Sequence, residues 1–113
     1  MDCIFCQIAT GKIPSDILYQ DSSVIAFRDI SPQSPTHILI IPKKHITSLA
    51  QLPDAEAPLI GHMAMIANKL AREQNIAESG YRVVINCGKQ GGQLVPHLHM
   101  HLLGGRQLSG TLG

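Results

Sequence analysis

The chain has 113 residues, a formal net charge of +1 and three cysteines, and these values exclude several classes of protein. So small a net charge gives no general attraction to nucleic acid or to an anionic membrane, and no apolar run approaches the roughly 20 residues of a membrane span. An odd number of cysteines argues against a disulfide framework, and the start MDCIF lacks the basic and apolar regions of a signal peptide. We therefore expect one cytoplasmic domain over residues 1–113, without nucleic-acid or membrane partners.

The segment CIFCQIAT, residues 3–10, predicts a short helix. Ile4 and Ile8 lie four positions apart, which is the spacing of one helix face. Cys3 and Cys6 form a C-x-x-C pair, and one helical turn would place both thiols on the same side.

Three short apolar runs then predict strands. The runs 17–20 and 24–27 are separated by an Asp-Ser-Ser turn, which favours a hairpin. A loop with two prolines over 29–37 leads to a β-branched run over 37–42, and this third strand should end at Pro42.

One long helix and two further strands follow. The stretch from residue 54 to about residue 75 carries apolar side chains at helical spacing. Residues 81–86 and 96–103 have strand character, and a glycine-rich loop over 88–93 lies between them. Strands with short links beside one main helix indicate an α+β domain with an antiparallel sheet.

The last predicted strand contains HLHMHLL, which sets three histidines at alternate positions. Alternate side chains of a strand share a face, so His97, His99 and His101 would follow one another about 6.6 Å apart, with Leu98 and Met100 on the buried face. A solvated strand face and a triple-histidine metal site are the alternatives to imidazole chemistry. Alternate residues on one flat strand converge poorly on a single ion, which favours the chemistry.

The histidine segment and its surroundings resemble the histidine triad superfamily. HLHMHLL is similar to the superfamily's signature, and over about residues 4–107 further segments resemble its HINT branch of purine nucleoside phosphoramidases: RDISPQSPTH, IPKKHI, GYRVVIN, GGQ and LGGRQ. The resemblance implies an α+β fold with a five-stranded antiparallel sheet, one long helix and one short helix. It also implies a homodimer in which two sheets join edge to edge.

The resemblance further implies nucleophilic catalysis by a catalytic set of His97, His99 and His101. Imidazole titrates near pH 6.5, so a good fraction is neutral at physiological pH. The central His99 would attack phosphorus and form a covalent intermediate that water then hydrolyses. His101 would donate a hydrogen bond to the phosphoryl oxygens, although it could instead bond to the backbone and only position the strand.

A pocket for a purine nucleotide is also implied. Asn86 would contact the phosphate and ribose, Asp29 would accept hydrogen bonds from both ribose hydroxyls, and the glycine-rich loop with Gly92 and Gln93 would bring backbone N–H groups to the phosphate. A turn-forming asparagine, a loop-capping aspartate and an ordinary strand connection are the structural alternatives. Three apolar side chains match positions around the base, although each could equally belong to the core: Phe5, Phe27 and Ile30.

One segment departs from the family pattern. Where the phosphoramidase branch usually has Ser-Val-aromatic before the first histidine, this chain has Leu94, Val95 and Pro96. Leu94 can neither donate nor accept a hydrogen bond, and losing one to a charged group costs about 1.5–3 kcal/mol, or roughly ten- to a hundred-fold. The tail LSGTLG also lacks the tryptophan of some relatives. Both changes weaken an inference about the leaving group, and neither affects the nucleophile.

A candidate metal site follows from the same resemblance. Some relatives bind zinc through two cysteines of such a pair, a distant histidine and the first histidine of the motif, which here are Cys3, Cys6, His45 and His97. Two thiolates and two imidazoles make a closed, structural tetrahedral site. The alternatives are two reduced thiols or a redox pair, and without zinc His45 would support the triad by hydrogen bonding.

The sequence therefore predicts a homodimeric hydrolase that cleaves the P–N bond of purine nucleoside phosphoramidates and releases AMP. The alternatives are a dinucleoside polyphosphate hydrolase or nucleotidyltransferase with the same intermediate, and a nucleotide-binding regulatory protein with incidental turnover. Of the remaining histidines, we expect His37 to cap its strand and His62 to lie at the surface or at an interface.

Overall fold

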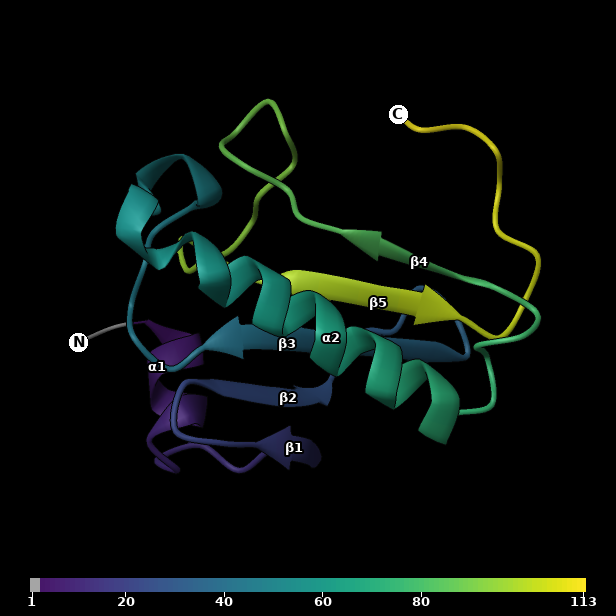
Figure 1. The fold of residues 1–113 in the computed structure, drawn as a ribbon, viewed down its shortest axis with the longest axis horizontal. Coiled ribbons are helices and arrows are strands. Elements are labelled where there is room, and N and C mark those ends of the chain that lie inside the picture. Colours follow the sequence, from purple (N-terminus) through teal and green to yellow (C-terminus); the bar gives the residue numbers. More distant parts are fainter. Residues whose placement is uncertain (1–2) are drawn as a thin grey trace.

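A five-stranded antiparallel sheet organises residues 3–113, the part of the chain that the computed structural model describes (Figure 1). The strand order is β1-β2-β3-β5-β4, and every neighbouring pair is antiparallel. The strands are β1 Ile17–Gln20, β2 Val24–Arg28, β3 Thr36–Pro42, β4 Tyr81–Val84 and β5 Met100–Gly104. The helices are α1 Ile4–Ala9 and α2 Ala57–Glu73, with short 3-10 turns at Leu49–Gln51 and Asp54–Glu56. The predicted fold class is confirmed.

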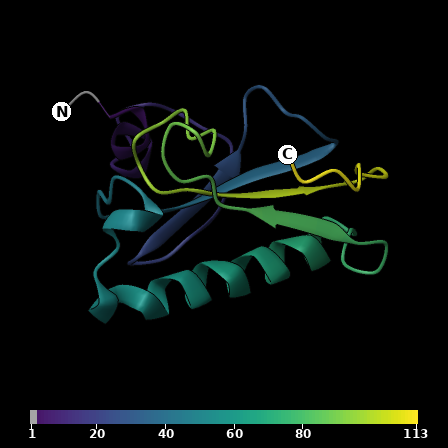
Figure 2. The same ribbon diagram turned by 90° about the horizontal axis from the view of Figure 1, so that it is seen from above.

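The two helices cover opposite faces of the sheet, as Figure 2 shows. One face packs against the apolar stripe of α2, with Ile38, Ile40 and Met100 among its buried strand residues. The other face packs against Phe5 and Ile8 of α1. Because both faces of β2 and β3 are covered, these strands are apolar at nearly every position instead of alternating.

The final strand is shorter than the sequence predicts, because β5 begins at Met100. Ile40 pairs with Met100 and Ile38 with Leu102, so the continued register would bring Leu98 opposite Pro42. A proline has no N–H to donate, and the ladder ends there. The Leu98 N–H instead bonds to the carbonyl of Ile46. His97 and His99 therefore lie just before the strand and only His101 lies within it.

The long helix also begins differently from the expectation. Asp54, where the predicted helix begins, instead starts a 3-10 turn, and α2 proper begins at Ala57 with a proline in its first turn. Pro58 fits there because the first N–H groups of a helix have no partner within the helix. Within residues 3–113, no helix combines the length and the apolar composition that crossing a membrane requires.

Candidate active site

His99 occupies the centre of a row of imidazoles on the α1 side of the sheet. Its Nδ1 donates a hydrogen bond to the backbone carbonyl of His97 over 2.7 Å. A carbonyl oxygen can only accept, so the proton of the neutral ring is on Nδ1, and Nε2 keeps its lone pair. Phe5 packs edge-on against this ring, with the centroids 5.1 Å apart, and only 5% of His99 is exposed. The ring is thus held with an unprotonated nitrogen available for bonding.

A chain of hydrogen bonds fixes His101 in the other tautomer. The backbone N–H of Gln33 donates to Nδ1 of His37 over 3.0 Å, so the neutral His37 ring carries its proton on Nε2. That Nε2 lies 2.9 Å from Nδ1 of His101 and 3.5 Å from a carboxylate oxygen of Asp29. His37 donates to His101, which leaves the His101 proton on Nε2. We call Asp29, His37 and His101 the Asp–His cluster.

Burial keeps both rings of this cluster neutral. Desolvation, together with the neighbouring His99 and His37 rings, lowers the pKa of His101 to about 4, against the opposing effect of the Asp29 carboxylate. Desolvation also lowers the pKa of His37, against the opposing effect of the Asp29 carboxylate. The neutral forms at physiological pH agree with the tautomers that the hydrogen bonds require.

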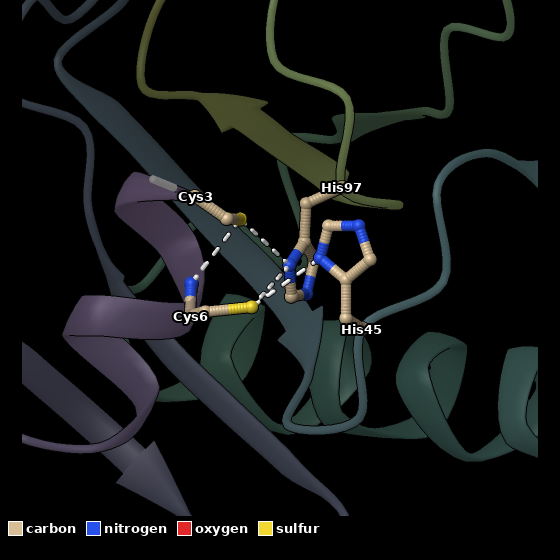
Figure 3. A group of neighbouring side chains, drawn as sticks. All are labelled: Cys3, Cys6, His45 and His97. Carbon is tan, nitrogen blue, oxygen red and sulfur yellow. Dashed lines mark hydrogen bonds between the residues drawn. The ribbon is translucent and has the colours of Figure 1, made fainter. Parts of the chain in front are cut away.

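At the other end of the row, two thiols and two imidazoles converge (Figure 3). Cys3 and Cys6 project from the start of α1 toward His97 and toward His45, which follows β3. Nδ1 of His97 lies 3.3 Å from Sγ of Cys3 and 3.6 Å from Sγ of Cys6, and Nδ1 of His45 lies 3.3 Å from Sγ of Cys6. The four candidate ligand atoms are all within 4.8 Å of one another. We call these residues the Cys–His cluster.

The tautomer of His97 suits metal binding. Nε2 of the fully buried His97 donates to the backbone carbonyl of Pro42 over 2.8 Å, so Nδ1 presents its lone pair to the two sulfur atoms. Two sulfur and two nitrogen donors in this arrangement match the preference of Zn²⁺ for a tetrahedral site of soft ligands. The side chains that the sequence assigns to a metal site fit one.

The residues predicted around the nucleoside differ in their access: Asp29 belongs to the Asp–His cluster, whereas Phe5 packs against His97 and His99. Asp29 has one oxygen near His37, and its other oxygen accepts the Ser31 N–H over 2.8 Å, as in the loop-capping alternative. Ile30 is 93% exposed. Phe5 and Phe27 are buried and pack edge-to-face with ring centroids 5.7 Å apart. Ile30 therefore presents an apolar surface to solvent, whereas the two phenylalanines support the site from beneath.

The glycine-rich loop is held mainly by its own side chains. Gln93 accepts the Gly88 N–H through Oε1 and donates through Nε2 to the carbonyls of Thr47 and Val95. Gly92 has a φ of +82°, which favours glycine. The side-chain amide of Gln93 thus positions the loop, and the backbone N–H groups of Gly92 and Gln93, predicted to face a phosphate, donate to the carbonyls of Lys89 and Gly88.

Asn86 is bound to the same loop, since its Nδ2 donates to the Gly91 carbonyl over 2.8 Å. A Cβ on Gly91 would collide with the backbone oxygen of Cys87. The tight turn beside Asn86 therefore requires a glycine at position 91.

Sequence reasoning missed the contact between His37 and His101. His37 stands near the start of β3, as expected, but its ring is buried against the triad. The pairing of Leu39 with His101 puts His37 on the same face, a register that no single segment of sequence reveals. His62, expected at the surface or at an interface, is half-buried on α2 and bonded through Nε2 to Asp21, 2.7 Å away.

Comparison with known proteins agrees with this arrangement. The model of the HIT domain family matches residues 10–108. The chain is 50% identical over 111 residues to the purine nucleoside phosphoramidase of Escherichia coli strain K12, covering 98% of this chain and 93% of that protein.

Two solved structures are similar to this chain over nearly its whole length. The HIT family hydrolase of Legionella pneumophila Philadelphia 1 superposes with a TM-score of 0.96 at 47% identity, over 99% of this chain and all (100%) of that one. A histidine triad protein from Clostridium difficile gives a TM-score of 0.96 at 49% identity, over 98% and 96% of the two chains. With the family model covering most of its length and its histidines placed as described, the chain belongs to the HIT domain family.

Proposed function

We propose that the chain hydrolyses purine nucleoside phosphoramidates, breaking the P–N bond to release a nucleoside monophosphate such as AMP and an amine. The observation that carries the proposal is the buried His99 ring, whose proton is committed to the His97 carbonyl and whose Nε2 is free. The 50% identity to the Escherichia coli purine nucleoside phosphoramidase, over nearly the whole of both chains, supports the substrate class.

In the first step, Nε2 of His99 attacks the α-phosphorus, the P–N bond breaks, and the amine departs with a proton from solvent, to which the attacking water of the second step returns one. The ring then carries phosphorus on Nε2 and a proton on Nδ1, so it is cationic. The His97 carbonyl, 2.7 Å from Nδ1, stabilises this positive charge without any rearrangement.

The Nε2–H of His101 is placed to donate to the phosphoryl oxygens as negative charge builds on them. The His99 and His101 ring centroids are only 5.0 Å apart, so a phosphoryl group on His99 would be within reach of His101. One such donor is often worth about 3 kcal/mol of transition-state stabilisation. In the second step, water attacks the phosphorus, the N–P bond breaks, and the His99 lone pair is restored.

For the nucleoside, we propose that Asp29 accepts hydrogen bonds from the ribose hydroxyls and that Ile30 covers the base. Asp29 already has its second oxygen near His37, so the ribose would lie at the His101 end of the row. Asn86 would contact the phosphate side, whereas the Gly92 N–H already donates to the Lys89 carbonyl over 3.1 Å. Buried Phe5 and Phe27 support this surface.

We also propose a structural zinc ion held by Cys3, Cys6, His45 and His97. When bound, the ion would cross-link these four side chains and would have no coordination position open to water or substrate, because all four ligands come from the protein. This cross-link would fix the His97 backbone, whose carbonyl orients His99.

Thiols at positions 3, 6 and 87 are free of disulfides, which supports a cytoplasmic location.

We further propose a homodimer in which two sheets join edge to edge. Strand β4 pairs on one side with β5, and no strand within residues 3–113 pairs with its other edge. Val83 on this strand is an exposed apolar residue. A monomeric mass at micromolar concentration would contradict the dimer.

The covalent step can be tested by trapping. A His101→Ala variant, slowed but with an intact nucleophile, is mixed with adenosine phosphoramidate and analysed by intact mass at neutral pH, since phosphorylated imidazole is labile in acid. We expect an added adenylyl group that disappears when His99→Ala is combined with it. Turnover without any adduct in either variant would overturn the mechanism.

AMP binding without turnover of any phosphoramidate would instead indicate a regulatory nucleotide-binding protein. Faster cleavage of dinucleoside polyphosphates than of phosphoramidates would indicate the other enzyme class.

A further inference from the structure

An apolar hollow of about 410 Å³ opens beside the Cys–His cluster, and the proposed reaction steps do not use it. Its walls include Ile4, Leu94, Val95 and Pro96, and Thr47 lines it as well. Within residues 3–113, the side chains that line it include no Asp, Glu, Lys or Arg. The hollow is therefore suited to hydrocarbon and offers no partner for a charged group.

The most exposed wall of this hollow is held in place by the loop beneath it. Leu94 is 92% exposed, and Ile4 across the hollow is partly exposed. The side-chain amide of Gln93, the residue before Leu94, donates to the carbonyl of Val95, the residue after it, over 3.0 Å. The same amide donates to the carbonyl of Thr47 over 2.8 Å. Two large aliphatic side chains facing solvent beside an active site are costly unless a ligand covers them.

The hollow lies on the side of the row opposite the proposed ribose site. Asp29 and His37 adjoin His101, whereas Cys3 and His45, which also line the hollow, adjoin His97. His99 stands between the two ends. A substrate with its ribose at Asp29 and its phosphorus at His99 would extend its remaining substituent, the amine, toward the hollow.

The direction of attack agrees with this placement. In an in-line displacement the bond to the amine breaks on the side of phosphorus opposite Nε2 of His99, so the amine begins by pointing away from the buried ring. Leu94 and Ile4 are the exposed aliphatic side chains of the hollow, whereas His99 is buried. Their hydrocarbon would cover the first carbons of the departing group.

We propose that this hollow is the leaving-group subsite and that the enzyme prefers phosphoramidates of amines with an uncharged hydrocarbon chain. The inference rests on the proposed function and deepens it. It assigns Leu94, which replaces the serine of the phosphoramidase branch, the role of selecting the amine. The reaction is unchanged: the P–N bond breaks, the amine takes a proton, and water completes the cycle.

The test compares two adenosine phosphoramidates that differ only at the far end of the amine, made from n-hexylamine and from ε-aminocaproate. Both present the same unbranched chain and the same P–N linkage, so the chemical step is matched. We expect kcat/KM for the hexyl compound to exceed that for the carboxylate by about tenfold, as the burial of roughly two methylene groups would give. Leu94→Ser should reduce this ratio to about threefold or less.

A matched control is Leu112→Ser, because Leu112 is as exposed as Leu94 (94%) but does not line the hollow. It should leave the ratio unchanged. An equal kcat/KM for the two compounds, or a ratio that Leu94→Ser does not alter, would overturn the subsite while unsubstituted adenosine phosphoramidate is still cleaved. Failure to cleave any of the three compounds would overturn the proposed function as well.

Discussion

The two ends of the histidine row carry similar side chains that are held by different backbone groups. In each of the Cys–His cluster and the Asp–His cluster, the candidate ligand atoms lie within 4.8 Å of one another. At the first end a backbone carbonyl, that of Pro42, accepts from Nε2 of His97 and leaves Nδ1 open toward the thiols. At the second end a backbone N–H, that of Gln33, donates to Nδ1 of His37 and leaves a proton on Nε2, where an ion would have to bind.

Proximity of ligand-type side chains is therefore not sufficient for a metal site. The backbone partner of each imidazole decides which nitrogen holds the proton, and so decides between metal binding and hydrogen-bond donation. In this molecule one end is suited to zinc and the other to supplying an N–H to the substrate. His99, the proposed nucleophile, lies between them and is oriented by the carbonyl of His97.

Metal content is expected to show the largest difference between the two ends. Protein purified without chelator should hold about one zinc per chain, and Cys3→Ser combined with Cys6→Ser should remove it. Loss of an ion present at a hundred times its Kd would cost about 2.7 kcal/mol of stability, or a fall of roughly 10 °C in Tm. Native mass spectrometry and thermal unfolding measure the two effects.

The matched variant at the other end is Asp29→Asn, which should keep its zinc. Less than half an equivalent in the parent, or equal loss from both variants, would show that the comparison between the clusters is wrong.

Removing His37 should affect catalysis without affecting the metal. His37→Ala leaves Nδ1 of His101 without its donor, so the ring is free to change tautomer and turn its lone pair toward the phosphoryl oxygens. We expect kcat/KM for adenosine phosphoramidate to fall by about a hundredfold, with zinc content unchanged.

His62→Ala is the control for His37→Ala, because it also removes a bonded histidine but lies on α2 against Asp21. It should leave kcat/KM within about twofold of the parent. A fall of the same size in both variants would mean that His37 acts only through the fold.

Much of the fold can be predicted from local sequence, but the different roles of the Cys–His cluster and the Asp–His cluster cannot. The apolar runs and the stripe on α2 predict the sheet and the long helix, and HLHMHLL marks the segment that is proposed to be catalytic. The start of β5 at Met100 depends on its register against Pro42, which is a long-range property. The tautomer of His37 depends on a hydrogen bond from the backbone N–H of Gln33. Nearly every residue type has a backbone N–H, so the sequence does not reveal which one binds His37.

The roles of Phe5 and Phe27 show the same limit. Both were expected near the base, and their apolar character is equally that of core residues. Only the packing of α1 on the sheet shows that Phe5 is buried against His99 and Phe27. Gln93 shows it as well: its backbone N–H is predicted to face the phosphate but donates to the Gly88 carbonyl, and its side-chain amide binds further backbone groups.

The smallest expected effect is a pH dependence of stability that arises at the Asp–His end. Burial lowers the pKa of His101 from its ordinary value near 6.5 to about 4, so the unfolded chain binds more protons than the native protein in this interval. Stability from this group is therefore complete above about pH 6.5 and is lost as the pH falls toward 4, by roughly 2–3 kcal/mol. The lowered pKa of His37 acts in the same direction.

His101→Gln cannot titrate, so urea unfolding of this variant should show a flatter loss of stability than the parent between pH 6.5 and 4. Metal release at low pH would affect the stability of both proteins, so it drops out when their two stability curves are subtracted. Parallel curves would show that His101 is not held neutral by the fold.

The most direct measurement of the central claim is the protonation of each ring nitrogen, read from ¹⁵N chemical shifts and two-bond ¹H–¹⁵N correlations of histidine-labelled protein near pH 7. The account predicts that His99 carries its proton on Nδ1, while His37 and His101 carry theirs on Nε2. A proton on Nε2 of His99 would contradict it, because the nitrogen assigned to attack phosphorus would have no lone pair.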